Sequence, residues 1–334
     1  MNREIANRLA VLPIVLWAVV TIVFVVLRLL PGSAADVLAQ QVTSAEQRQS
    51  IVRALGLDRS IWEQYLLFLG NLFRFDLGIS YYSGRSVTAL LGEAMPVTIE
   101  LAVASVIVMT VIGIGTGAMA ATFRNTWGDA CLRAVATVFF SMPWFWLGIL
   151  LILAFGVEWA VLPTFGRLPA AVTYVPRTNF VLIDAVLTSR YDLVWPWLRH
   201  LILPSLTVGL TTAGFVTRIS RASFVDTMYQ NHVRTARMKG MSEWRVFWHH
   251  IFRNAALPII TIIGLQFGAL LGGAVISEVV FSYPGIGRLM VNAIFQRDYP
   301  VVEGAALVIA LLYICVNLVT DIAYVYIDPR LRRT

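Results

Sequence analysis

Long apolar runs alternate with polar segments along the chain. Six runs are long enough to cross a bilayer, and they cover residues 9–30, 96–122, 132–157, 201–217, 255–281 and 304–327. A helix rises about 1.5 Å per residue, so roughly 20 apolar residues span the ~30 Å hydrocarbon core. Inside hydrocarbon each backbone N–H and C=O has to bond within its own segment, so we expect six transmembrane helices. The predicted fold class is all-α, with one polytopic transmembrane domain over residues 1–334.

The first apolar run has to be distinguished from a cleaved signal peptide, because Arg3 and Arg8 precede it. Residues 9–27 carry no charge, and this run exceeds the roughly 7–15 residues of a secretory apolar core. We therefore expect it to be retained as the first span.

Basic residues are concentrated between particular runs, which predicts the orientation in the membrane. Residues 218–253 hold seven basic residues against two acids, and residues 328–334 hold three arginines, whereas residues 31–95 hold five arginines against six acids. The positive-inside rule places the basic segments and both termini in the cytoplasm. The segments at about 31–95, 158–200 and 282–303 are then extracytoplasmic.

The composition excludes other classes of protein. Hydrophobic residues make up 58% and charged residues 13%, about half of the ~25% charged residues of soluble domains. Membrane lipid is the expected solvent, and cytoplasmic flanks explain the net charge of +7 better than nucleic-acid binding does. Cys131 and Cys315 lie in or beside apolar runs, where we expect small buried side chains.

Catalytic and metal-binding patterns are missing from the sequence. The only lysine, Lys239, precedes Gly240 and Met241, so it cannot belong to a phosphate-binding loop of the form GxxxxGK[ST]. The four histidines form no metal-binding motif. We expect no enzyme activity, metal or cofactor in this chain, and any energy from ATP would have to come from a separate protein.

Ion-coupled carriers place ionisable residues deep in the membrane, and three carboxylates are candidates for such a role: Glu100, Glu278 and Asp321. Each lies near the end of a predicted span, and none has an evident basic partner in mid-membrane. For Glu278 we favour bonding to a neighbouring helix over lining a pore, and both interpretations stay open.

An amphipathic stretch follows the first span. Its apolar residues recur at helical spacing: Ile61, Trp62, Tyr65, Leu66, Leu69 and Phe73. We expect a helix that packs on the membrane domain rather than a binding site.

The segment between the fourth and fifth runs predicts a helix–turn–helix. Gly240 can end the first helix in the left-handed conformation, and Ser242 can be the N-cap of the second. On the second helix the apolar residues fall on one face: Trp244, Phe247, Trp248, Ile251 and Phe252. Such an element with a basic rim is typical of helices that enter a groove of another protein.

This segment resembles the signature loop of binding-protein-dependent ABC importer permeases, in their dipeptide/oligopeptide/nickel branch. The similarity is carried by residues 234–240 (RTARMKG) and residues 254–258 (NAALP). Ala236 and Gly240 keep the spacing of the superfamily signature, and the Arg-Thr pair before Ala236 replaces its Glu-Ala, as is typical of this branch. Other motifs resemble the branch in the same order: LGLD at 55–58 with Trp62, Gln64 and Tyr65, DLGxS at 76–80, EVVFSYPGIG at 278–287, RDYP at 297–300 and DPR at 328–330.

The resemblance implies a type I importer permease of MetI-like architecture, the first permease of a pair, in a bacterial inner membrane. It implies a second homologous permease subunit, two ABC ATPase subunits and an extracytoplasmic substrate-binding protein as partners. It implies peptides as the solute, with nickel, glutathione or another small solute as alternatives. Residues 218–255 would be the coupling loop, and its residues expected to couple to the ATPase are Arg234, Thr235, Ala236, Arg237, Lys239, Gly240, Ser242 and Trp244.

Candidates for the pore or gate lie on the fifth run. Its glycines recur every four residues, which favours close helix approach, and Gly113 and Gly117 repeat this spacing on the second run. Gating motion and static packing are open alternatives for both stripes. The pore candidates are Gly264, Gln266, Gly268, Gly272, Ser277 and Glu278.

Two other classes of function stay open. A self-sufficient channel or ion-coupled carrier predicts solute flux from this chain alone without ATP, although the weak central ionisable residues argue against it. A structural subunit of a membrane enzyme complex predicts no solute movement.

Overall fold

The regular secondary structure of the described residues is helical, which confirms the all-α fold class. The computed structural model describes residues 2–29, 49, 52–53 and 56–327, without the side chains of residues 2–11, 269, 271–273 and 321–327. Five helices in this part are long and apolar enough to span a bilayer. They are α1 (Asn2–Leu29), α5 (Val87–Thr122), α9 (Val194–Met228), α12 (Arg253–Val280) and α14 (Tyr299–Ile327).

Shorter helices connect the long ones. They are α4 (Ile61–Phe73), α8 (Val181–Leu187), the 3₁₀ turn η2 (Tyr191–Leu193), α10 (Asn231–Met238), α11 (Glu243–Arg245), the π-helical η3 (Val246–Phe252) and α13 (Ile286–Phe295).

The third predicted span is not one continuous helix, which corrects the expectation. α6 (Trp127–Ser141) is followed by α7 (Trp144–Leu151) and the π-helical η1 (Ile152–Glu158). The helix axis bends by 106° between α6 and the half formed by α7 and η1. Pro143 has no backbone N–H and disfavours helical conformation in the preceding Met142, whose ψ is 131°. If the bent pair counts as one span, the described residues hold six candidate spans.

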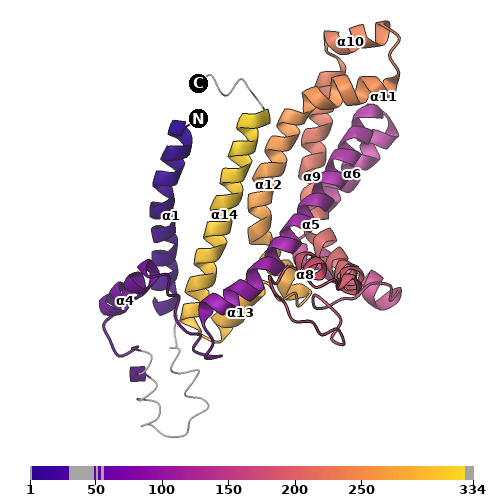
Figure 1. Cartoon of the computed structure of the whole chain (residues 1–334). Coiled ribbons are helices and arrows are strands. Elements are labelled where there is room, and N and C mark those ends of the chain that lie inside the picture. Colours follow the sequence, from indigo (N-terminus) through magenta and orange to yellow (C-terminus); the bar gives the residue numbers. More distant parts are fainter. Residues whose placement is uncertain (1, 30–48, 50–51, 54–55, 328–334) are drawn as a thin grey trace.

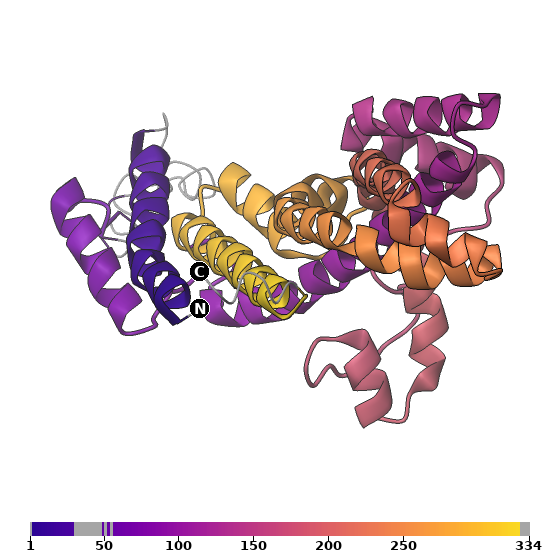
Figure 2. The ribbon, with the colours of Figure 1, turned by 90° about the horizontal axis from the view of Figure 1, so that it is seen from above.

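The long helices form an elongated row. α1 lies beside α14, α14 beside α12, and α12 beside α9, which also packs against α5 and α6 (Figures 1 and 2). α10 lies at one end of these helices, called the elbow end here, and α13 lies at the opposite end, the α13 end (Figure 1). α1 begins and α14 ends at the elbow end.

α9 is the most enclosed of the five long helices, although it was predicted from the shortest run. It extends well beyond residues 201–217 in both directions. The hydroxyls of Thr207, Thr211 and Thr212 donate to carbonyls one turn earlier, at 2.9, 3.1 and 2.8 Å. Because these hydroxyls are bonded within the helix, α9 can be buried in spite of its weak hydropathy.

Glycines let α5 and α9 approach closely. A Cβ at Gly113 or Gly117 would lie 2.6 Å from a side chain of α9, and a Cβ at Gly209 of α9 would lie 2.5 Å from Val108 of α5. The close approach predicted from the glycine spacing is therefore present.

A buried ion pair joins α6 to α9. Asp129 is 1% exposed and accepts two hydrogen bonds from the Arg221 guanidinium, at 2.7 and 2.6 Å, and one from Arg133, at 3.0 Å. Two-point arginine–carboxylate contacts are strong and directional. This pair was not predicted from the sequence, because its two members lie far apart in the chain.

α4 packs on α1 with only part of its apolar stripe. Tyr65 and Phe68 contact the Phe24 ring, at centroid distances of 5.1 and 5.6 Å. The rest of the stripe is mostly exposed, including Ile61, Trp62, Leu66 and Phe73. The packing expected of this helix is thus limited to one of its sides.

The two cysteines do not lie where the sequence predicts them. Cys131 and Cys315 are free and exposed, not buried, because each lies on an outward face of its helix in the single chain. The motif at 328–330, part of the motif at 55–58 and most of residues 31–51 lie outside the described residues.

Two motifs that are distant in sequence meet at the α13 end. Asp298 of RDYP accepts hydrogen bonds from the Ser80 hydroxyl, at 2.5 Å, and from the Tyr81 N–H, at 3.0 Å. Burial, and next the charge of Glu303, raise the pKa of Tyr81 to about 12, so this phenol stays neutral at ordinary pH.

Gly117→Ala is expected to destabilise the protein. The new Cβ would lie 3.0 Å from the Thr217 carbonyl oxygen and 2.6 Å from the Ser220 Cβ, and backbone of α9 cannot yield without moving the helix. Overpacking of this kind costs roughly 1–3 kcal/mol. Thermal unfolding of the purified chain in detergent measures the effect.

Gly115→Ala is the matched control on the same helix. A Cβ at Gly115 meets nothing within 4 Å, and alanine is favoured over glycine in a helix by about 1 kcal/mol. Equal melting temperatures for the two variants would contradict the close contact of α5 and α9.

Candidate functional site

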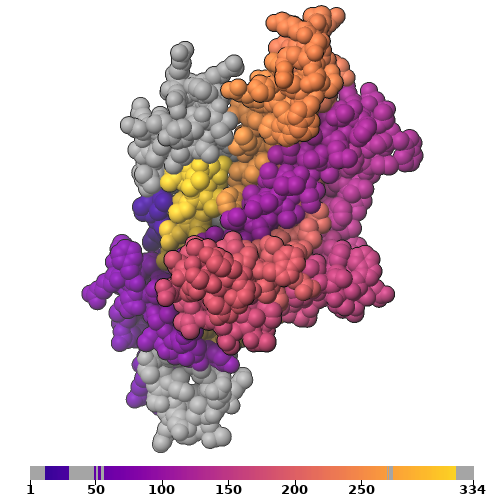
Figure 3. Space-filling view, turned by 45° about the vertical axis from the view of Figure 1, so that its right-hand side comes forward, coloured from indigo at the N-terminus to yellow at the C-terminus, as the bar shows by residue number. Residues whose placement is uncertain are grey.

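The elbow, defined as residues 229–252, connects α9 to α12 and projects beyond the bundle (Figure 3, orange, top). Its turn is formed at Gly240, which has φ +76°. The Gly240 N–H donates to the Arg237 carbonyl at 2.9 Å, and the Met241 N–H donates to the Ala236 carbonyl at 3.4 Å. This is the left-handed helix end predicted from the sequence. A Cβ at Gly240 would meet nothing within 4 Å, so the constraint is backbone conformation and not space.

A small apolar core holds the elbow on the bundle. Ala236 and Val233 of α10 and Val246 and Ile251 of η3 are buried against Phe224 of α9. The same cluster includes Ala121, Ala255 and Ile259 of the long helices α5 and α12. A load applied to the elbow is therefore carried by packed side chains to α5, α9 and α12.

The outer face of the elbow is exposed and basic. Met238 and Trp244 are 72% and 74% exposed. Arg237 pairs with Glu243 across the turn, at 2.9 and 3.2 Å. The other coupling candidates on this face are also exposed: Arg234, Thr235, Lys239 and Ser242.

Ser242 occupies the N-cap position of α11, but its hydroxyl makes no capping bond. Its backbone carbonyl accepts the Val246 N–H at 2.9 Å instead. The predicted position of the cap is correct, and the predicted side-chain bond is absent.

The apolar face predicted for the second elbow helix is divided. Ile251 is buried, and Phe247 and Phe252 pack against the Phe224 ring at 5.6 and 6.1 Å. Trp244 and Trp248 face outward and contact each other edge to face at 5.5 Å. The reason is the π-helical turn η3, whose wider turn changes the angles that a 3.6-residue period assigns.

One helical backbone joins the elbow to the fifth span. α11, η3 and α12 follow one another without a non-helical residue from Glu243 to Val280, and the chain bends between η3 and α12 (Figure 1). A π-helical turn and Pro258 account for the bend. Trp244 and Gln266 thus lie about 30 Å apart along one helical path.

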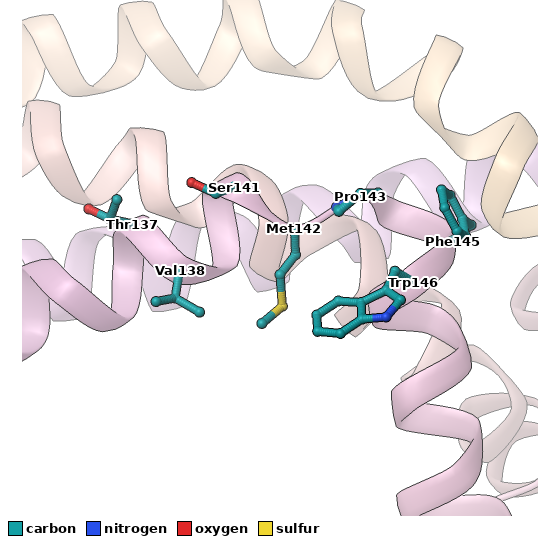
Figure 4. A pocket seen from close by; sticks show the side chains of 7 residues that line it. All are labelled: Thr137, Val138, Ser141, Met142, Pro143, Phe145 and Trp146. Carbon is teal, nitrogen blue, oxygen red and sulfur yellow. The ribbon is translucent and has the colours of Figure 1, made fainter.

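The bend between α6 and α7 lines two grooves. One has a volume of about 560 Å³. Its lining residues Val138, Met142 and Trp146 extend from the ribbon to the same side (Figure 4). The other, of about 460 Å³, lies between Met142 and the polar residues Thr211, Thr212 and Gln266. None of the residues lining either groove is charged.

The glycine stripe of α12 consists of Gly264, Gly268 and Gly272, and at Gly268 it faces α14. A Cβ at Gly268 would lie 3.0 Å from the Asn317 side chain and 3.1 Å from the Tyr313 ring. Gly264 is half-buried, and the surroundings of Gly272 lie outside the described part. Gating by this stripe stays a prediction.

Glu278 is fully buried, and it caps a helix of its own chain. Its carboxylate accepts hydrogen bonds from the Thr98 hydroxyl, at 2.6 Å, and from the Arg288 N–H in the first turn of α13, at 3.0 Å. A carboxylate is stabilised by the free N–H groups and the dipole at a helix N-terminus. Gly285 is required beside it, since a Cβ there would lie within 2.5 Å of the carboxylate.

The favoured interpretation of Glu278, bonding to a neighbouring helix, agrees with this geometry. Ser277 is also buried and donates to the Pro204 carbonyl at 3.4 Å. Neither side chain can touch a solute in this conformation. Gln266, another of the pore candidates, lines the second of the two grooves at the α6–α7 bend.

Glu100 has a basic partner, which corrects the expectation. Arg167, from the segment after η1, donates to it at 2.6 Å, and the Trp197 indole N–H donates at 3.0 Å. The partner was missed because it comes from outside the predicted spans. The side chain of Asp321 lies outside the described part.

The fold and the site define a polytopic helical membrane component with an exposed elbow made to contact another protein. Residues 113–333 match the family described as "Binding-protein-dependent transport system inner membrane component", and residues 1–102 match its N-terminal companion family. The chain therefore belongs to this family of ABC importer permeases.

Known relatives cover the whole chain. It is 37% identical to the di/tripeptide transport system permease protein DppB of Pseudomonas aeruginosa and 35% identical to the dipeptide transport system permease protein DppB of Escherichia coli K12, in each case over 99% of both chains. The inward-facing MetNI methionine ABC transporter shares the fold, with a TM-score of 0.52 and 15% identity over 72% of this chain and 97% of that chain.

Membership of the family confirms several predictions. The chain is a permease of the dipeptide/oligopeptide branch with a MetI-like fold, and it is a component of the inner membrane. It is a transport component and not an enzyme, because ATPase activity lies in partner subunits. The family also implies a substrate-binding partner.

Gly240→Leu is expected to uncouple the elbow without dissociating the complex. A leucine in the left-handed conformation is strained by about 1–2 kcal/mol, which favours a different turn. ATPase stimulation by the liganded binding protein, in reconstituted complexes, is expected to fall several-fold.

Gly240→Asn is the matched control, since asparagine adopts the left-handed conformation more readily than other residues. It is expected to retain most of the stimulation. Normal stimulation of the leucine variant would refute a coupling role for this turn.

Proposed function

We propose that this chain forms half of a passage for di- and oligopeptides through a bacterial inner membrane. A second homologous permease supplies the other half, and two ATPase subunits dock at the elbow. One observation carries the proposal: a single helical path leads from the exposed Trp244 to Gln266 in the groove at the α6–α7 bend. ATPase movement at the elbow is thereby transmitted to the residues beside the passage.

The names of the relatives, and the lining of the grooves, support peptides as the solute. The two relatives named above are described as transporters of dipeptides or tripeptides. A bare nickel ion would be expected to need imidazole, thiolate or carboxylate groups along its path. The lining residues of both grooves include none of these, so the uncharged peptide bonds of an organic solute fit the grooves better than a metal ion does.

The orientation follows from charge and from the placement of the helix ends. We place the elbow end in the cytoplasm, because the basic segment lies there and α1 begins and α14 ends at the same end (Figure 1). The α13 end, with the segment preceding α5, then faces the extracytoplasmic binding protein. ATP and Mg²⁺ are bound by the ATPase subunits, and this chain holds no cofactor.

An ion-coupled carrier fits less well. The buried carboxylates of Glu100, Glu278 and Glu303 all accept hydrogen bonds from groups of this chain. The Glu303 carboxylate accepts one from the Arg28 guanidinium at 2.7 Å. A carrier needs a carboxylate that can exchange an ion with water. These three have structural partners instead.

Reconstitution in proteoliposomes tests the proposal directly. Uptake of a labelled dipeptide is expected only when this chain, the sister permease, both ATPases, the binding protein and ATP are all present. Uptake by this chain alone, or uptake without ATP, would support a channel or carrier. No dipeptide uptake by the complete complex would exclude peptides as the solute.

Trp244→Ala is expected to weaken ATPase binding at least tenfold. Truncation of an exposed tryptophan at the centre of an interface costs about 2 kcal/mol or more, and each 1.4 kcal/mol is about tenfold in affinity. Titration of detergent-solubilised permease pairs with ATPase measures the change. Trp62→Ala is the control, because Trp62 is equally exposed, at 76% against 74%, but lies on α4. Equal affinities for the two variants would place the ATPase elsewhere.

A further inference from the structure

Gln266 carries a side-chain amide that has no hydrogen-bond partner among the described residues. It lies about midway along α12, between Arg253 and Val280. At 1.5 Å per residue it is roughly 20 Å from either end of the helix, near the centre of the hydrocarbon layer. A carboxamide with two donors and an acceptor is unfavourable there unless another group bonds to it.

No group of the described residues bonds to the Gln266 amide in this structure. Thr211 and Thr212 line the same groove, but their hydroxyls already donate to carbonyls of α9. The remaining walls are apolar and include Met142, Trp144 and Ile276. Gln266 therefore has the largest unused hydrogen-bonding capacity of the lining residues, with two donors and an acceptor against the one indole N–H of Trp144 and the acceptor lone pairs of the two threonine hydroxyls.

The helix break places irregular backbone beside this groove. Met142 and Pro143 are extended, and they interrupt the third span. Non-helical backbone at membrane depth is tolerated where it is buried in protein or lines a water-filled cavity, and not where it meets lipid. The groove volume of about 460 Å³ lies within the roughly 300–1,000 Å³ of small-molecule sites.

We infer that the Gln266 carboxamide contacts the main chain of the peptide as it passes. This inference rests on the proposed function and adds the group that recognises the solute. A peptide bond offers one N–H and one C=O, and a carboxamide can match both at once. Lipid tails can match neither.

The same geometry would let peptides with different side chains pass. The walls of the groove are apolar and uncharged, and they include Met142, whose flexible side chain adapts to different shapes. The invariant part of the solute, its backbone, would meet the polar group, and the variable part would meet the walls.

Gln266→Leu tests the contact in the complete reconstituted complex. The substitution keeps approximate size and removes the amide. We expect the initial rate of trialanine uptake to fall at least tenfold, while ATPase stimulation by the liganded binding protein stays within twofold of wild type. Gln296→Leu is the matched control, because Gln296 follows α13 and lines neither groove. It is expected to leave uptake unchanged.

Each alternative explanation of the Gln266 amide predicts a different result in these experiments. Unchanged uptake by Gln266→Leu would show that the amide faces lipid or an inert cavity, and would overturn the inference. Loss of the sister permease on purification would show that Gln266 bonds across the subunit interface, and would also overturn it. Failure of the wild-type complex to take up trialanine would instead refute the proposed function on which the inference rests.

Water access gives a second readout that does not depend on transport. In a chain with Cys131→Ser and Cys315→Ser, Gln266→Cys is expected to react with a hydrophilic maleimide, and trialanine supplied with the binding protein is expected to slow the reaction at least threefold. Leu265→Cys, at the neighbouring position on α12, where the native side chain is 56% exposed, is the control and is expected to react at least tenfold more slowly. A Gln266→Cys thiol that is unreactive, or is not protected by the peptide, would overturn the inference.

Discussion

Close packing of α5 on α9 is the contact from which the rest of the structure takes its position. The two helices meet through glycines at Gly113, Gly117 and Gly209, where no other residue leaves room. α9 also contacts α6, α7, α12 and η3. Its Arg221 holds α6, its Pro204 carbonyl accepts from α12, and its Phe224 supports the elbow. In a membrane such contacts depend on shape, because the lipid supplies little drive for one apolar surface to prefer another.

Buried charge in this protein is used to join segments. Asp129 joins α6 to α9, Glu100 holds the segment after η1, and Glu278 caps α13. Each carboxylate is matched by donors of the same chain, which offsets the cost of removing it from water. These three carboxylates are therefore held by structural hydrogen bonds within the chain. This agrees with a family in which ATPase subunits supply the energy.

The elbow and the groove belong to one mechanical unit. The elbow core is packed against α5, α9 and α12, and its second helix continues into α12. η3 and Pro258 bend this helix without interrupting it, so displacement of one end has to move the other. Interfaces of packed side chains shift between discrete arrangements rather than deform gradually. A rigid elbow on a continuous helix can therefore link two states of the groove.

The sequence by itself determined the helical class and the position of five spans, the turn at Gly240 and the lack of a phosphate-binding loop in this chain. These depend on local properties: the length of an apolar run, the backbone freedom of glycine, and the absence of a lysine in a phosphate loop. The family motifs were also recognisable from consecutive residues. The roles of the coupling and pore residues stay predictions.

Only the tertiary structure decided the 106° bend after Ser141, the partners of Glu100 and Glu278, and which aromatic residues of the elbow face outward. Pro143 is visible in the sequence, but the direction that the chain takes after it depends on packing against α9 and α12. Arg167 and Glu100, or Asp298 and Ser80, are too far apart in the chain for any periodic pattern to pair them. The π-helical turn likewise breaks the period from which helix faces are predicted, because its hydrogen bonds span one residue more.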